Sequence, residues 1–169
     1  MCLRLASVGL AALFVLSGVG CATGSPGPTV PDESELGALA INDPIFVSYE
    51  PGRGYTCSTW AGAKLWLNNA DFAEAIKRTL SNARGNVVAD ENAARYVLSF
   101  SGAGAEVRYE MLDRASNRVV WRTTKPWPEQ VSGCALCCND HARTHFAWLA
   151  EDLAAWDGTP QATDQGEKQ

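Results

Sequence analysis

The residues best suited to chemistry lie in one short segment, CALCCNDHARTH, which starts at Cys134 and contains both histidines of the chain. Its spacing is C-x2-C-C-x2-H-x3-H. Thiolates and imidazoles are the ligands that hold Zn²⁺ tetrahedrally, and two histidines four residues apart share one face of a helix. One hypothesis is therefore a zinc site made by Cys134, Cys137, Cys138, His141 and His145.

Disulfides are the competing use of the same cysteines. When Cys2 and Cys21 in the amino-terminal signal are set aside, four of the six cysteines remain, and an even number in an exported chain favours disulfides over metal. Cys137 and Cys138 are adjacent and rarely bond to each other, so Cys57 and Cys134 would each pair with one of them. A bridge from Cys57 would contribute roughly 4 kcal/mol by closing a long loop. We therefore expect no cofactor, with zinc as the alternative.

Thiol redox catalysis is a third interpretation of this segment. A thiol of Cys137 or Cys138 near the start of a helix could have a lowered pKa. The thioredoxin pattern, however, places its C-x-x-C early, directly after a strand in a βαβ unit. Here the cysteines come late and follow a proline-rich loop, which makes the redox interpretation weaker than disulfides.

Other catalytic motifs are missing from the sequence. It contains no G-x-S-x-G, no H-E-x-x-H and no P-loop. The glycine-rich stretch Gly52–Gly62 lacks the Lys-Ser/Thr pair that binds phosphates, and we expect it to be a plain loop. Glu106 and Glu110 alternate with apolar residues, which is typical of the wet face of a strand. We predict a protein that is not an enzyme.

The first twenty residues have the pattern of an export signal. A short segment with Arg4 precedes the apolar run Leu5–Leu16, and small residues follow up to Gly20. The apolar run is too short for a confident transmembrane helix. Residues 1–20 are therefore predicted to be a signal peptide.

The end of this signal, LSGVGC, resembles the lipobox of bacterial lipoproteins. The resemblance implies cleavage before Cys21, acylation of its thiol and, because Ala22 is not Asp, an outer-membrane location facing the periplasm. Gly20 fits this pattern, whereas Gly18 departs from the usual leucine. Ordinary secretion into the periplasm or medium is the alternative.

The charge of the chain excludes some partners. The net charge is −5, and loss of Arg4 with the signal leaves −6. Such a chain has no basic stripe to displace the counterions of a nucleic acid, and no strong electrostatic attraction to anionic lipid. We expect no nucleic-acid partner.

Hydrophobic periodicity predicts an α+β fold, with an antiparallel sheet of three to five strands and two helices packed on it. The predicted elements are strands over 45–49, 96–100, 107–111 and 119–124, and helices over 69–84 and from Asn139 or Asp140 to about Trp156. Gly85 is expected to end the first helix. The tryptophans are expected to fill the core, because each ring buries a large area.

Composition divides the chain into four parts. Residues 1–20 form the signal, and residues 21–40, rich in proline, glycine and acid, are expected to be a flexible tether. Residues 41–158 form a single α+β periplasmic domain. Residues 159–169 are polar, and we expect them to be a disordered tail.

Three sequence segments of the predicted sheet are similar to those of a group of small Gram-negative envelope lipoproteins. The segments are A-R-Y-V-L from Ala94, V-R-Y-E-M-L-D from Val107 and R-V-V-W from Arg118. The group includes curli-secretion-like, penicillin-binding-protein-activator-like and transport-auxiliary lipoproteins. The resemblance implies the α+β fold, attachment to the membrane through Cys21 and a partner that is another envelope protein. Of the residues that carry function, it implies only the acylated Cys21.

Overall fold

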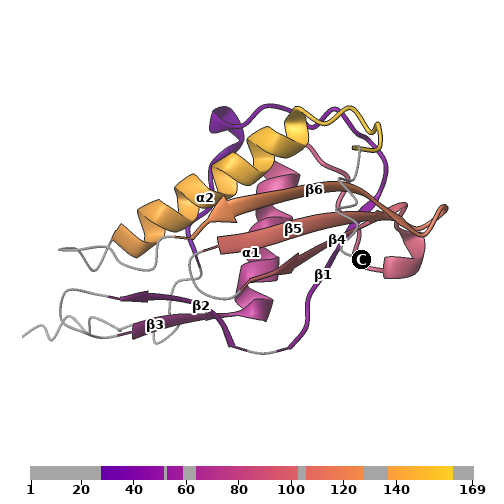
Figure 1. The fold of residues 1–169 in the computed structure, drawn as a ribbon. Coiled ribbons are helices and arrows are strands. Elements are labelled where there is room, and N and C mark those ends of the chain that lie inside the picture. Colours follow the sequence, from indigo (N-terminus) through magenta and orange to yellow (C-terminus); the bar gives the residue numbers. More distant parts are fainter. Residues whose placement is uncertain (1–27, 52, 59–63, 103–105, 128–136, 162–169) are drawn as a thin grey trace, which may run out of the picture.

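The domain is built on a four-stranded sheet with two long helices (Figure 1). In this computed structural model, the structure describes residues 28–51, 53–58, 64–102, 106–127 and 137–161. The strands are β1 (Ile45–Ser48), β2 (Arg53–Ser58), β3 (Lys64–Asn68), β4 (Tyr96–Ser101), β5 (Glu106–Asp113) and β6 (Arg118–Pro126), and the helices are α1 (Asn69–Asn82) and α2 (Cys137–Ala154). Short 3₁₀ turns span Glu33–Glu35 and Glu91–Ala93.

The strand order in the main sheet is β1-β4-β5-β6. The pairs β4–β5 and β5–β6 are antiparallel, as predicted, whereas β1 adds to β4 in parallel. The predicted α+β class is confirmed. Because β6 ends the strand order, one side of its backbone has no neighbouring strand among the described residues.

Both helices pack on the same face of the sheet. Along β5, side chains buried on that face alternate with side chains on the opposite face. Tyr109 is fully buried, whereas its neighbours Arg108 and Glu110 lie on the opposite face. Phe72 of α1 joins the layers, since its ring lies 4.9 Å from that of Phe100 on β4 and 5.1 Å from that of Phe146 on α2. The core thus lies between this face and the two helices.

Helix α1 follows the prediction with small shifts. Asn68 caps its first turn by accepting a hydrogen bond from the backbone N–H of Asp71, at 2.8 Å. The helix ends at Asn82, two residues before the predicted end, and Arg84 takes the left-handed conformation at φ 60°. Gly85 is therefore not the left-handed residue. It is needed for close packing, because an added Cβ would lie 2.9 Å from the Leu80 carbonyl oxygen.

The tether prediction is wrong for residues 28–40, which run against the domain. The carbonyl of Pro28 accepts a hydrogen bond from Arg78 at 2.8 Å, and that of Pro31 accepts one from Asn82 at 2.7 Å. Leu39 is buried in the core, where its backbone N–H donates to Ala83. Composition concealed this because the apolar residues of the segment are few, but Leu39 lies in the core and Val30 and Leu36 pack against it.

Three other boundaries differ from the prediction. The stretch expected to be a loop contains β2, which forms a separate antiparallel hairpin with β3 that contacts α1. Helix α2 begins at Cys137, before the expected cap at Asn139 or Asp140. The expected disordered tail begins with ordered residues, because the N–H of Gln161 donates to the carbonyl of Val120 at 2.8 Å.

The tryptophan prediction holds for three side chains. Trp121, Trp127 and Trp156 are buried, whereas Trp148 on α2 is 40% exposed. Trp60 lies outside the described residues, and the side chain of Trp66 is not among those described. Within the described part of the chain, no helix is both long and apolar enough to cross a membrane.

Gly85→Ala tests the packing of the segment before β1 against α1. The added Cβ would meet a backbone oxygen that cannot move freely, and it would also lie 2.7 Å from Cδ1 of Leu39. We expect the free energy of unfolding to fall by about 1–3 kcal/mol, measured by urea denaturation.

Gly37→Ala is the matched control. Its Cβ would lie 3.9 Å from that of Ala154, and a change within about 0.5 kcal/mol is expected. Equal losses in the two variants would contradict this account.

Candidate binding surface

His145 is the one member of the predicted zinc set whose side chain the structure describes, and it is locked in the core. It is 1% exposed. Its Nδ1 lies 3.0 Å from the carbonyl oxygen of Pro126, and its Nε2 lies 2.6 Å from the hydroxyl of Tyr109. A carbonyl can only accept, so Nδ1 carries the proton and Nε2 accepts from the tyrosine. Both ring nitrogens are therefore used within the protein.

The surroundings of His145 keep the ring neutral. Burial lowers the pKa of His145 from an ordinary value of 6.5 to about 4, and nearby Lys125 acts in the same direction, whereas the bond to Pro126 opposes them. Rings of Phe72, Trp127 and Phe146 surround it, with centroids between 5.0 and 6.0 Å away. A charged imidazolium would lose most of its hydration there. His145 acts as a packing residue with satisfied hydrogen bonds.

For the other predicted site residues, the structure describes at most the backbone. Cys57 lies in β2, and Cys137, Cys138 and His141 lie in the first turns of α2, with side chains that are not among those described. Cys134 lies outside the described residues, as does Cys21. Among the described residues, no group of three or more potential ligands could hold a metal ion. Disulfides and a zinc site that lacks His145 both stay predictions.

The outer edge of β6 presents backbone groups that sequence reasoning did not single out. Two of them are already bonded by Gln161: its N–H donates to the carbonyl of Val120, and its side-chain oxygen accepts from the N–H of Arg122 at 3.0 Å. These bonds show that Val120 and Arg122 direct backbone groups away from β5. Sequence alone placed the strand but could not say that it ends the sheet.

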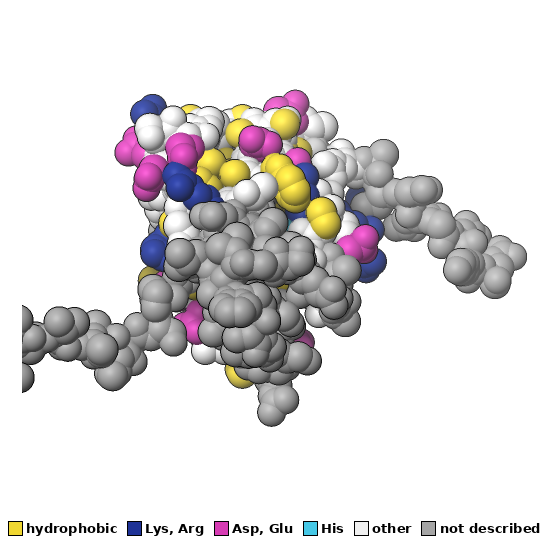
Figure 2. All heavy atoms as spheres, turned by 90° about the vertical axis from the view of Figure 1, so that its left-hand side faces the viewer, with side chains coloured by type: hydrophobic (Ala, Val, Ile, Leu, Met, Phe, Trp, Pro, Cys, Tyr) yellow, Lys and Arg dark blue, Asp and Glu magenta, His cyan; other side chains and the backbone are white. Residues whose placement is uncertain are grey.

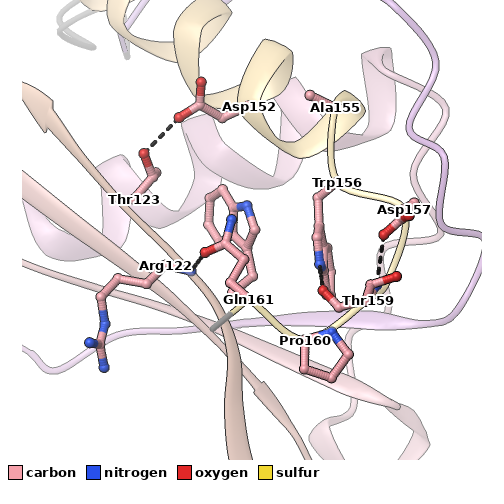
Figure 3. Close-up of a pocket in the computed structure, with 10 residues that line it drawn as sticks. Arg122, Thr123, Asp152, Ala155, Trp156, Asp157, Thr159, Pro160 and Gln161 are labelled. Atoms are coloured by element: carbon pink, nitrogen blue, oxygen red, sulfur yellow. Dashed lines mark hydrogen bonds between the residues drawn. The ribbon is translucent and has the colours of Figure 1, made fainter. Parts of the chain in front are cut away.

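A groove of about 460 Å³ lies beside this edge (Figure 3). One wall of the groove is formed by β6, through Trp121, Arg122 and Thr123. A second wall is formed by the end of α2 around Asp152 and Ala155, and the segment that leads to Gln161 closes one side. The carboxylate of Asp152 accepts from the Thr123 hydroxyl at 2.6 Å and pairs with the ammonium of Lys125 at 2.7 Å. These bonds hold α2 against β6 while the groove stays open to solvent.

The segment after α2 is held firmly at this groove. The indole N–H of Trp156 donates to the Thr159 carbonyl at 2.6 Å, and the N–H of Thr159 donates to the carboxylate of Asp157 at 2.8 Å (Figure 3). Gly158, at φ 87°, makes the turn between them in a conformation that favours glycine. The turn delivers Gln161 to the edge of β6.

A smaller polar hollow of about 180 Å³ lies on the face of the sheet away from the helices. Glu106, Arg108 and Thr124 line it, together with Ser101 and Gly102. On the side shown in Figure 2, exposed hydrophobic side chains form small separate groups among acidic and basic ones. The described part of that side shows no broad apolar patch.

Comparison with known proteins gives likenesses among solved structures, including the following two. A Xanthomonas campestris protein described under the family model DUF330 is 14% identical, with a TM-score of 0.45, and the match covers 78% of this chain and 92% of that one. The PelC dodecamer from Paraburkholderia phytofirmans is 20% identical, with a TM-score of 0.44, over 75% of this chain and 92% of that chain. No family model and no curated protein sequence matches.

The buried state of His145 predicts a specific loss of stability in acid. Its pKa is 6.5 when unfolded and about 4 when folded, so below pH 6.5 the unfolded chain binds a proton that the folded chain excludes. The free energy of unfolding should therefore fall as the pH drops from 6.5 to 4, by about 3 kcal/mol at 1.36 kcal/mol per pKa unit.

Urea denaturation at several pH values checks this expectation. In His145→Asn the side-chain amide can still donate to Pro126 but does not titrate. We expect this variant to be less stable at pH 7.5 and to lose less stability between pH 6.5 and 4. Carboxylates titrate in both proteins, so the difference between the two curves isolates His145. Parallel curves would refute the assignment.

Proposed function

We propose that this chain is a non-enzymatic lipoprotein, anchored in the outer membrane through Cys21, whose periplasmic domain binds another envelope protein. The observation that carries the proposal is the edge of β6 with its groove, a surface that offers hydrogen-bonding groups and shape rather than reactive side chains. His145, whose ring nitrogens are both bonded, is not available as a catalytic base at this surface.

The geometry of the amino-terminal segment limits how the domain would sit on the membrane. Only residues 22–27 separate Cys21 from Pro28, which is buried and bonded to α1 through Arg78. At about 3.3–3.6 Å per residue, the fully extended chain from Cys21 to Pro28 spans at most about 25 Å. An acylated Cys21 would therefore hold the part of α1 around Arg78 close to the membrane, and not on the long tether that composition predicted.

The anchor is tested by Cys21→Ser, with Cys2→Ser as the matched control inside the predicted signal. Acyl chains contribute about 0.8 kcal/mol per buried methylene, so two or three chains make attachment effectively permanent. We expect Cys21→Ser to abolish membrane attachment in cell fractionation. Cys2→Ser should stay in the membrane fraction and show the intact mass of a diacylated or triacylated Cys21. An unmodified Cys21 in the wild-type protein would contradict the anchor.

The same mass measurement addresses the rival function, a periplasmic metal-binding or thiol-redox protein. Thiols are blocked before and after unfolding in the absence of reductant. Our proposal expects no free thiols among Cys57, Cys134, Cys137 and Cys138. Free thiols with stoichiometric zinc, lost in His141→Ala, would instead support the metal site.

Site-specific photocrosslinking tests the binding surface. A benzoylphenylalanine at Ala155, which lines the groove, is expected to give a defined adduct with one envelope protein in intact cells. The same group at Glu74, exposed on α1, is the control and should not give that adduct. The absence of an adduct at Ala155, or equal adducts at both positions, would argue against binding at this surface.

A further inference from the structure

We propose that the edge of β6 binds its partner by strand addition, in which an extended segment of the partner pairs with the backbone of β6 at Arg122 and Thr124. This inference rests on the proposed function, because it names how the same surface would recognise a protein. Three observations support it: the direction of the backbone groups at the edge, the hydrogen bonds that Gln161 makes with two of these groups, and the charge of the side chains on β6.

The direction of the backbone groups follows from the described bonds. The N–H of Arg122 points away from β5, because it donates to the side chain of Gln161. Backbone groups alternate between the two sides of a strand, so Thr124, two residues further, directs its N–H and C=O to the same outer side. Among the described residues, Gln161 bonds the outward groups of Val120 and Arg122, and His145 bonds the carbonyl of Pro126.

Among the described residues, the part of the edge without a backbone partner is bounded at both ends. Gln161 occupies the end at Val120, and at the other end Pro126 has no N–H, while its carbonyl accepts from His145. The carbonyl of Arg122 and both backbone groups of Thr124 lie between these limits. An extended peptide matches such a row, since it presents donors and acceptors at the same two-residue interval.

Gln161 itself shows that this edge accepts strand-like pairing. Its backbone N–H and side-chain oxygen bond two outward groups of β6, as a neighbouring strand would do with backbone groups alone. The residues before it, up to Trp156, wall the groove next to the edge. The partner's segment would continue the pairing that Gln161 begins, next to this groove.

Charge indicates the chemistry of the partner. β6 contains Arg118, Arg122 and Lys125 and no acidic residue, although the chain as a whole carries −5. Arg122 pairs with Glu110 at 2.9 Å and Lys125 with Asp152. On the open face, Arg108 lies opposite Thr124 in the β5–β6 register and has no ion-pair partner among the described residues. Side chains of an added strand alternate between the groove and the open face of the sheet, where Arg122 lies. We therefore infer an extended segment with acidic residues on its open-face side.

The probe is a set of acidic heptapeptides selected from a random display library against the detergent-solubilised mature protein. Each selected peptide is resynthesised with N-methyl groups on one or the other set of alternate residues. Methylation of the residues whose N–H groups face β6 should raise Kd about tenfold, the effect of losing one or two hydrogen bonds. Methylation of the other set should leave Kd unchanged.

The protein side is tested at Thr124. Thr124→Pro removes the outward N–H and should raise Kd about tenfold as well, whereas Thr124→Val keeps the backbone and the shape and should bind like the wild type. Because proline could also disturb the strand, amide hydrogen exchange is followed in the wild-type protein. The Thr124 amide should exchange readily in the free protein and become protected when the peptide binds.

Three results would overturn strand addition: no peptide selected, equal effects of the two N-methyl sets, or no protection of the Thr124 amide. They would mean that Gln161, Pro126 and the cationic side chains only protect the edge from aggregation. If the adduct at Ala155 persisted, binding at the groove would stand and only the mode of recognition would be wrong. If the adduct were also absent, the proposed function itself would fail.

Discussion

Packing of two helices on a single face of the sheet is the constraint on which the rest of this structure depends. Phe72 lies where the layers meet, in contact with rings from β4 and α2 and with Trp127 beyond β6. A sheet covered on one face needs side chains that alternate between apolar and polar along each strand, and β5 has this pattern throughout. The arrangement leaves the edge of β6 and the uncovered face as the parts of the sheet that the helices do not cover, and our proposed binding surface lies there.

The hydrogen-bonded pair of Tyr109 and His145 is part of the same core. A buried imidazole costs free energy unless both nitrogens find partners, and here β5 supplies the tyrosine hydroxyl and the end of β6 supplies a carbonyl. The pair thus joins α2 to both strands at the point where β6 ends. A residue that looks like a metal ligand in the sequence therefore has a structural role. Its neutral state follows mainly from burial.

The segment before β1 changes how the whole molecule would be presented to a partner. Pro28, Pro31 and Leu39 are bonded to α1 and to the residues that follow it, and Arg143 of α2 pairs with Glu35. If Cys21 is acylated as we propose, this segment restricts the distance between α1 and the membrane. Such a restriction lowers the entropy lost on binding a partner in the same membrane, which would suit the association that we propose.

The sequence by itself determined the local elements and the class of the fold. The spacing of Phe72, Ile76 and Leu80 predicted α1, and the alternation along Val107, Tyr109 and Met111 predicted β5, because both periodicities arise from the geometry of one element. The export pattern before Cys21 is likewise read from contiguous residues, and it stays a prediction. Only the tertiary structure decided that His145 is enclosed, that residues 28–40 belong to the domain and that β6 forms the edge capped by Gln161. Each of these depends on contacts between residues far apart in the chain, and such contacts leave no periodic signal in the sequence.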